Sequence, residues 1–220
     1  MASDSQADRQ TLRAIQDFRV AQDRATALHG QLEGAYADTV LALAHAVEAR
    51  DGTTGEHVER VLRLCRAMGE ALEFSGAALK RLEFAAVLQD VGKIGIPDAI
   101  LLKSGPLNAE EMALARTHAA LGRSILQGVA FLAPVVDAIA GHHEKWDGTG
   151  YPAGLAGEAI PLAARIIAVA DSYDAMISDR PYRAALPEAA ARAELRRAAG
   201  TQFDPRMVAV FLAGLAADGR

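Results

Sequence analysis

The segment Leu88-Gln89-Asp90-Val91-Gly92-Lys93-Ile94-Gly95-Ile96-Pro97 combines charged side chains with residues that end a helix. An apolar helical pattern runs from about residue 76 to residue 89, and Gly92 together with Gly95-Ile96-Pro97 interrupts it. Lys93 follows Asp90 by three positions, which is within the reach of one helical turn. We therefore expect this segment to present a carboxylate and an ammonium group together at the end of a helix.

Helical patterns also dominate the rest of the chain. Alanine, leucine, arginine and glutamate are abundant, and apolar residues recur at intervals of three and four positions. We find no convincing pair of strands and predict an all-α protein. Besides the helix at 76–89, we expect helices at about 56–73, 162–178, 187–199 and 205–216. A further helix starts at the N-cap Asn108, with Glu111 in a capping box, and carries His118. Another begins at about 132 and delivers His142 and His143 at its end.

The first 50 residues form a separate part of the predicted organisation. Residues 8 to 50 have the pattern of one long helix, and small or apolar residues alternate at spacings of four and three from Ala14 to Ala42. Such a heptad seam is typical of a coiled coil and predicts a homodimer through this helix. An amphipathic helix packed on its own domain is the alternative. We divide the chain into an N-terminal helix, 1–50, and a globular domain, 51–220.

Composition narrows the class of protein. The chain has 220 residues, is 51% hydrophobic and carries a net charge of −5, which argues against a partner that is a nucleic acid polymer. No stretch has the roughly 20 consecutive apolar residues that a membrane helix needs, so no membrane partner is expected. The N-terminus does not resemble a signal peptide, and the single cysteine, Cys65, lies in an apolar stretch. These features favour a cytoplasmic location and place Cys65 in the core.

Histidines and aspartates supply candidate metal ligands. His57, His118 and Asp171 are separated in the sequence, whereas His142 and His143 are adjacent and can offer two imidazoles to one centre. A single histidine in a helix is more often a packed or surface residue than a ligand. Imidazole and carboxylate together suit iron, manganese, zinc or nickel.

The order of these residues resembles a known family. The segments Thr54-Gly55-Glu56-His57, Leu88–Pro97, Gly141–Pro152, Ala168-Val169-Ala170-Asp171 and Ser178-Asp179-Arg180-Pro181-Tyr182 are similar to the motifs of HD-GYP proteins, a family of cyclic-di-GMP phosphodiesterases. The resemblance covers about residues 45 to 216. It implies an HD-type helical bundle with a metal centre, and a cyclic-di-GMP hydrolase that yields linear pGpG, GMP or both.

The resemblance also implies roles for individual residues. Asp90 would bridge two metals, which would be divalent transition metals such as iron or manganese, with one or two bound per chain. His118, His142 and His143 would complete one site, and His57, Asp171 and the residue at position 89 would hold the other. Lys93 would pair with a substrate phosphate, so the catalytic residues would be Asp90 and Lys93.

Further residues are candidates for substrate binding. Gly150-Tyr151-Pro152 would line the pocket, contact a protein partner, or do both. Trp146 would stack on a guanine or anchor its loop. Arg180 and Arg183 are candidates for phosphate or guanine contacts, and solvated or structural arginines are the alternative.

Position 89 departs from the family pattern, because the histidine of the eponymous His-Asp pair is Gln89 here. Glutamine keeps an oxygen donor but loses the basic nitrogen, so Gln89 is expected to be a weak or absent ligand. Two hypotheses follow. The protein is a phosphodiesterase that tolerates Gln89, or it is a catalytically degenerate domain that signals by binding a nucleotide or a protein.

Overall fold

The computed structural model describes residues 2–51, 56–179 and 184–217. The prediction of an all-α protein is confirmed, because these ranges contain helices and one isolated β-bridge but no strand. The chain divides into two compact units, Met1–Thr39 and Val40–Arg220. Across the described ranges, none of the helices combines the length and the apolar character needed to cross a bilayer.

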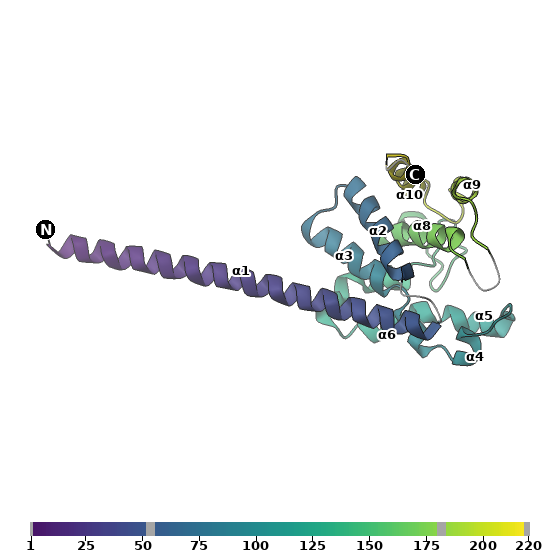
Figure 1. Ribbon diagram of the computed structural model, residues 1–220, viewed down its shortest axis with the longest axis horizontal. Helices are drawn as coiled ribbons and strands as arrows, with labels where there is room; N and C mark the ends of the chain where they lie inside the picture. The colour runs from purple at the N-terminus through teal and green to yellow at the C-terminus, as the bar shows by residue number, and fades with distance from the viewer. Residues whose placement is uncertain (1, 52–55, 180–183, 218–220) are drawn as a thin grey trace. The chain divides into compact units, whose positions relative to one another are not determined.

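The longer elements are α-helices, several joined by short 3₁₀ helices (Figure 1). They are α1 (Ala2–Asp51), α2 (Glu56–Ala71), α3 (Gly76–Leu88), η1 (Val91–Gly95), α4 (Asp98–Leu101), α5 (Ala109–Arg116), α6 (His118–Leu126), η2 (Ala130–Val135), α7 (Val136–Ala140), η3 (Gly157–Ala159), α8 (Leu162–Ile177), α9 (Glu188–Ala198) and α10 (Pro205–Ala217). The capping box at the start of α5 is present as predicted, between Asn108 and Glu111.

Two predicted helices are each divided in the structure. The helix expected to run from Asn108 through His118 is two helices, α5 and α6, which meet at Thr117. The Thr117 hydroxyl donates to the Leu114 carbonyl at 2.7 Å, and such local bonds compete with the helical ladder. The helix expected from about 132 is the 3₁₀ helix η2 followed by the short α7. Pro134 lies inside η2 and has no N–H to donate.

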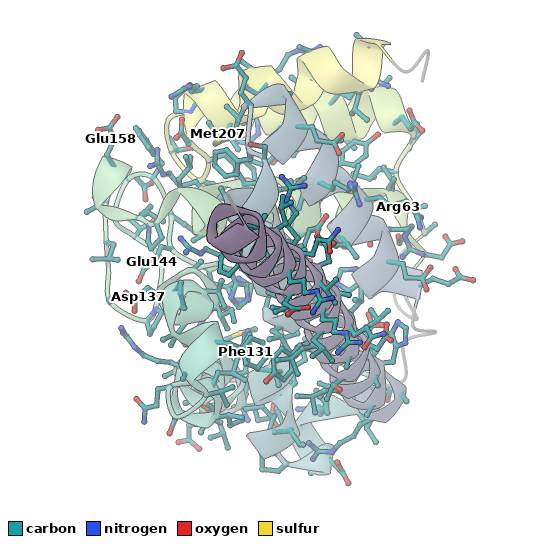
Figure 2. All side chains as sticks on the ribbon, turned by 90° about the vertical axis from the view of Figure 1, so that its left-hand side faces the viewer. Arg63, Phe131, Asp137, Glu144, Glu158 and Met207 are labelled. Carbon is teal, nitrogen blue, oxygen red and sulfur yellow. The ribbon has the colours of Figure 1, made fainter. Side chains whose placement is uncertain are left out.

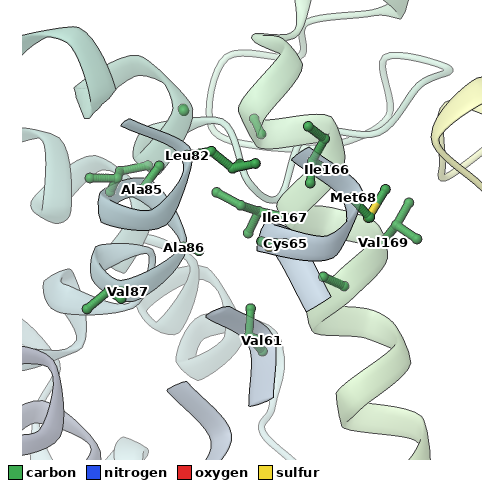
Figure 3. Close-up of a cluster of buried hydrophobic side chains, with 14 of the residues drawn as sticks. Val61, Cys65, Met68, Leu82, Ala85, Ala86, Val87, Ile166, Ile167 and Val169 are labelled. Carbon is green, nitrogen blue, oxygen red and sulfur yellow. The ribbon is translucent and has the colours of Figure 1, made fainter. Parts of the chain in front are cut away.

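The core of the second unit lies where α2, α3 and α8 pack together (Figure 3). Its buried side chains include Val61, Cys65 and Met68 from α2, Leu82, Ala85 and Ala86 from α3, and Ile166, Ile167 and Val169 from α8. Cys65 is fully buried, as predicted, and this burial raises the pKa of its thiol. The packed helices provide a rigid support for the loops at their ends, where the candidate ligands lie.

Gly92 permits a close approach between two segments of this unit, η1 and α6. A Cβ atom built on Gly92 would lie 1.8 Å from the carbonyl oxygen of His118 and 2.5 Å from the backbone nitrogen of Gly122. These atoms belong to the backbone and cannot rotate away. The absence of a side chain at position 92 therefore lets Asp90 approach His118.

Replacing Gly92 by alanine is expected to lower the free energy of unfolding by about 3 kcal/mol, because η1 and α6 must separate to admit the new methyl group. Urea denaturation monitored by circular dichroism measures the change. Gly105→Ala is the matched control, since nothing lies within 4 Å of a Cβ at that position. Equal stability of the two variants would contradict the close approach.

Candidate metal centre

Four of the predicted ligands come together in the structure. Asp90, His118, His142 and His143 each offer a ligand atom, and these atoms all lie within 4.8 Å of one another. The Nε2 atom of His118 lies 3.4 Å from that of His142 and 3.1 Å from that of His143. The four side chains form a cluster that we call the primary cluster.

Helix ends position the members of the primary cluster. Asp90 follows α3 and immediately precedes η1, and His118 is the first residue of α6. His142 and His143 lie in the turn after α7. Helix packing brings these chain segments together, because α6 packs against both η1 and α7.

Backbone carbonyl groups orient two of the imidazoles. The Nδ1 atom of His118 lies 2.7 Å from the Ala115 oxygen, and that of His142 lies 2.6 Å from the Ile139 oxygen. A carbonyl only accepts, so Nδ1 carries a proton in both rings, and Nε2 is the atom whose lone pair is left to bind a metal. The lone pairs then face one another across the primary cluster. This arrangement fits a bound cation, and the nitrogen and oxygen donors suit a divalent transition metal.

The protonation states of the primary cluster favour metal binding as well. Burial lowers the pKa of His142, and burial together with the neighbouring imidazoles lowers that of His143 to about 3. Burial alone would raise the pKa of Asp90, but the charge of Lys93 and the nearby histidines lower it overall. Near neutral pH His142 and His143 therefore offer neutral imidazoles, and Asp90 offers an ionised carboxylate.

The three remaining predicted ligands form a second group beside the primary cluster. Asp171 Oδ1 lies 3.4 Å from His57 Nε2 and 3.4 Å from Gln89 Nε2. Burial lowers the pKa of His57, but hydrogen bonds with Asp171 and Asp174 outweigh this effect and raise it to about 10. His57 is therefore protonated near neutral pH, and a metal must displace that proton before it can bind there.

Gln89 is almost fully buried in this second group. Its amide nitrogen faces Asp171, and within the described part of the chain its amide oxygen has no hydrogen-bond partner. An unsatisfied buried oxygen costs about 1–3 kcal/mol. The oxygen is available as a donor to a cation, but an amide is a poorer ligand than the imidazole it replaces.

Asp174 and Arg60 support His57, and neither was predicted from the sequence. Asp174 is 1% exposed, and its Oδ2 lies 2.7 Å from His57 Nδ1. Arg60 donates to both Asp174 oxygens, at 2.5 and 3.1 Å. The signal available in the sequence was spacing, because Asp174 follows Asp171 by three residues and so lies on the same face of α8.

Replacing Asp174 by asparagine is expected to lower the free energy of unfolding by about 3 kcal/mol, because Arg60 and the protonated His57 lose a buried counter-charge. Urea denaturation in the presence of a chelator isolates this effect from metal binding. Glu56→Gln removes the same charge from an exposed partner of Arg60 and should cost less than about 1 kcal/mol. If Asp174→Asn lowers the free energy of unfolding no more than Glu56→Gln does, Asp174 is not the buried counter-charge of Arg60 and His57.

Lys93 lies beside Asp90, as the spacing of three residues predicted, and its role toward a substrate phosphate stays a prediction. Its Nζ is 3.0 Å from Asp90 Oδ2. Arg50, near the end of α1, supports the surrounding backbone by donating to the carbonyl groups of Lys93, Ile94 and Ile96 at 2.6–2.9 Å and to Asp98 at 2.8 Å. Arg50 was not predicted from the sequence, because its partners lie more than 40 positions away.

Tyr151 packs directly on the primary cluster. Its ring stacks on that of His143 with 4.8 Å between centroids, and burial raises the pKa of its hydroxyl to about 12. Gly150 permits this placement, since a Cβ there would lie 2.3 Å from the Lys145 nitrogen. Buried Glu144, labelled in Figure 2, accepts hydrogen bonds from the backbone of Ala153 and Leu155 and so holds the loop just beyond Pro152.

The other candidate substrate residues are placed differently. The guanidinium group of Arg165 lies over the Trp146 ring, 5.8 Å from the ring centroid. The backbone nitrogen of Trp146 donates a hydrogen bond to the Gln202 carbonyl. These contacts favour the interpretation of Trp146 as an anchor of its loop. Arg180 and Arg183 lie outside the described residues, so their assignment stays a prediction.

The fold and the site together define an all-α domain with a partly buried cluster of three histidines and one aspartate that could hold a metal ion. The HD domain family model matches residues 42–207. The chain therefore belongs to the HD domain family, and the predicted membership of its HD-GYP branch is confirmed by relatives that are named as cyclic-di-GMP phosphodiesterases.

Three curated relatives illustrate the similarity. The cyclic di-GMP phosphodiesterase response regulator RpfG of Xanthomonas campestris is 43% identical over 89% of this chain and 52% of its own length. A cyclic di-GMP phosphodiesterase of Vibrio cholerae is 41% identical over 79% of this chain and 38% of its own. The 3'3'-cGAMP-specific phosphodiesterase 2 of Vibrio cholerae is 40% identical over 80% of this chain and 34% of its own length. The chain thus spans about half of the length of these relatives, or less.

Solved structures show the same fold. A cyclic GMP-AMP specific phosphodiesterase of Vibrio cholerae superposes with a TM-score of 0.63 at 24% identity, covering 81% of this chain and 48% of the other. An HD-GYP protein of Bdellovibrio bacteriovorus superposes with a TM-score of 0.60 at 22% identity, and the match covers 73% of this chain and 51% of the other. At these identities the likeness concerns the fold alone.

Proposed function

We propose that this protein is a metal-dependent phosphodiesterase that hydrolyses cyclic-di-GMP to linear pGpG, GMP or both. The convergence of Asp90, His118, His142 and His143 carries the proposal, because it provides a partly buried group of candidate metal ligands beside a lysine. The relatives named as cyclic-di-GMP and 3'3'-cGAMP phosphodiesterases support a cyclic dinucleotide as the substrate class.

The primary cluster would hold one divalent transition metal, iron or manganese. A second metal would depend on His57, Asp171, Asp90 and the weaker donor Gln89, and would be bound less tightly. The metal would supply Lewis-acid polarisation of a phosphoryl oxygen. Lys93 would place a positive charge beside the same phosphate, and Asp174 would orient His57.

A catalytically degenerate binding module is the second candidate function. Gln89 favours it, because the amide replaces an imidazole and its nitrogen already pairs with Asp171. In this alternative the domain binds a cyclic dinucleotide, or a protein partner through the loop of Gly150-Tyr151-Pro152, and signals without hydrolysis. The cytoplasmic location predicted from the sequence stays a prediction.

One experiment separates the two candidate functions. Protein purified without chelator is analysed for metal content and then assayed by chromatography with cyclic-di-GMP, before and after reconstitution with Mn²⁺ or Fe²⁺. Linear or mononucleotide product that depends on metal supports the enzyme. Ligand-induced thermal stabilisation without product, after reconstitution with either metal, would support the binding module and overturn the enzyme.

We also propose that the N-terminal helix mediates a homodimer. Phe18, Leu28 and Leu32 occupy the heptad seam and are exposed. Replacing Leu28 and Leu32 together by glutamate is expected to reduce the mass in solution from that of a dimer toward the 23.2 kDa of one chain. Light scattering coupled to size exclusion measures the mass, and Gln31→Glu, off the seam, is the control. A wild-type monomer, or a dimer that survives the double change, would contradict this proposal.

A further inference from the structure

A cavity of about 190 Å³ adjoins the primary cluster. His118 and Tyr151 form part of its wall, so one side of the cavity is shared with the candidate metal centre. Another part of the lining is apolar and comes from the residue that follows η1, from α4, from the segment between α4 and α5, and from α5. Its side chains are Ile96, Ile100, Leu101, Leu107 and Met112.

Two cationic side chains also line the cavity. Lys93 approaches Asp90, and the Arg116 guanidinium lies 5.2 Å from the centroid of the Tyr151 ring, a distance typical of a cation–π contact. The described lining residues include no carboxylate. The cavity is therefore apolar on one side, positively charged at Lys93 and Arg116, and adjacent to a metal-binding group.

The walls are held in place by polar contacts outside the cavity. Arg50 donates to three carbonyl groups around η1 and pairs with Asp98 in α4. At the start of α5, Glu111 accepts from Lys103 Nζ at 2.6 Å and from the Asn108 backbone at 2.8 Å. These bonds connect α4 to η1 and the following loop to α5, so the apolar wall is formed before a ligand arrives.

A flat aromatic ligand joined to an anion matches this combination. A sugar or peptide would leave hydroxyl or amide groups against five hydrophobic side chains that cannot satisfy them. The faces of a purine base need no hydrogen bonds, whereas its edge does. Arginine pairs with the O6 and N7 acceptors of guanine through two hydrogen bonds, and adenine presents a donor in place of O6.

We propose that this cavity receives one guanine base of the cyclic dinucleotide, with Arg116 on the O6 and N7 edge and the phosphodiester at the primary cluster. The inference rests on the proposed function, because it takes a cyclic dinucleotide as the ligand. It assigns guanine preference to Arg116 in α5, a residue outside the motifs that carry the family resemblance.

The test compares base recognition with base-independent chemistry. Arg116→Ala and Met112→Trp, which fills the cavity, are compared with Leu114→Ala, an exposed position of the same helix that does not line it. Dissociation constants for cyclic-di-GMP and cyclic-di-AMP are measured by calorimetry on the full chain. Metal content and the dissociation constant for Mn²⁺, which involve no base, report on the metal centre.

Both cavity variants are expected to bind cyclic-di-GMP about tenfold more weakly, with metal content and the dissociation constant for Mn²⁺ unchanged. Arg116→Ala should also reduce the preference for cyclic-di-GMP over cyclic-di-AMP by about tenfold. Wild-type affinity in both variants, or an unchanged preference in Arg116→Ala, would overturn the inference while leaving the proposed function intact. A wild-type protein that neither binds nor hydrolyses any cyclic dinucleotide would overturn both.

Discussion

Replacing Asp90 by alanine is expected to remove the metal from the primary cluster and to lower the turnover of cyclic-di-GMP by about a thousandfold or more, equivalent to about 4 kcal/mol of transition-state stabilisation. Asp90 supplies the negative charge in a group whose other members are three imidazoles. Its removal also takes away the carboxylate that lies 3.0 Å from Lys93, so a cation would face the ammonium group without the Asp90 charge between them. Elemental analysis and chromatography of the products measure the two effects.

Asp38→Ala is the control for this change, because it removes an exposed carboxylate of α1 that belongs to the first compact unit. It should leave metal content and turnover unchanged. Retention of metal and of turnover by Asp90→Ala would show that the primary cluster is not the catalytic centre. Circular dichroism spectra of both variants establish that the fold is preserved.

Replacing Gln89 by histidine is expected to raise the metal content from about one to about two per chain and to increase turnover by as much as about a thousandfold. The position is nearly fully buried beside Asp171, so an imidazole there would stand next to two other candidate ligands, His57 and Asp171. It would supply the basic nitrogen that the amide lacks. Metal titration and steady-state assays of the two proteins measure the change.

Gln89→Leu provides the matched comparison, because it keeps the approximate volume and removes the oxygen donor. If Gln89 is a weak ligand, the leucine variant should hold no second metal and turn over more slowly than the wild type. A wild-type protein that already contains two metals, and gains nothing from histidine, would show that the amide is a sufficient ligand and contradict the expected effect.

Local patterns in the sequence were sufficient to predict most of the helices. The boundaries expected for α2, α3, α8, α9 and α10 agree with the structure to within two residues, because apolar spacing and helix-breaking residues act within a few positions. The divisions at Thr117 and Pro134 were missed, since a hydroxyl and a missing N–H interrupt a helix without changing its apolar pattern.

The sequence by itself determined the helical content, the order of the donor residues and the unusual glutamine at position 89. Only the tertiary structure decided which donors meet, and it brought Asp90 to His118, His142 and His143 across gaps of 28 to 53 positions. It also supplied partners that no local pattern indicates, such as Asp174 for His57 and Glu144 for the loop after Pro152. The physical reason is range: helix formation depends on near neighbours, whereas ligand convergence and buried hydrogen bonds depend on packing between elements distant in the chain.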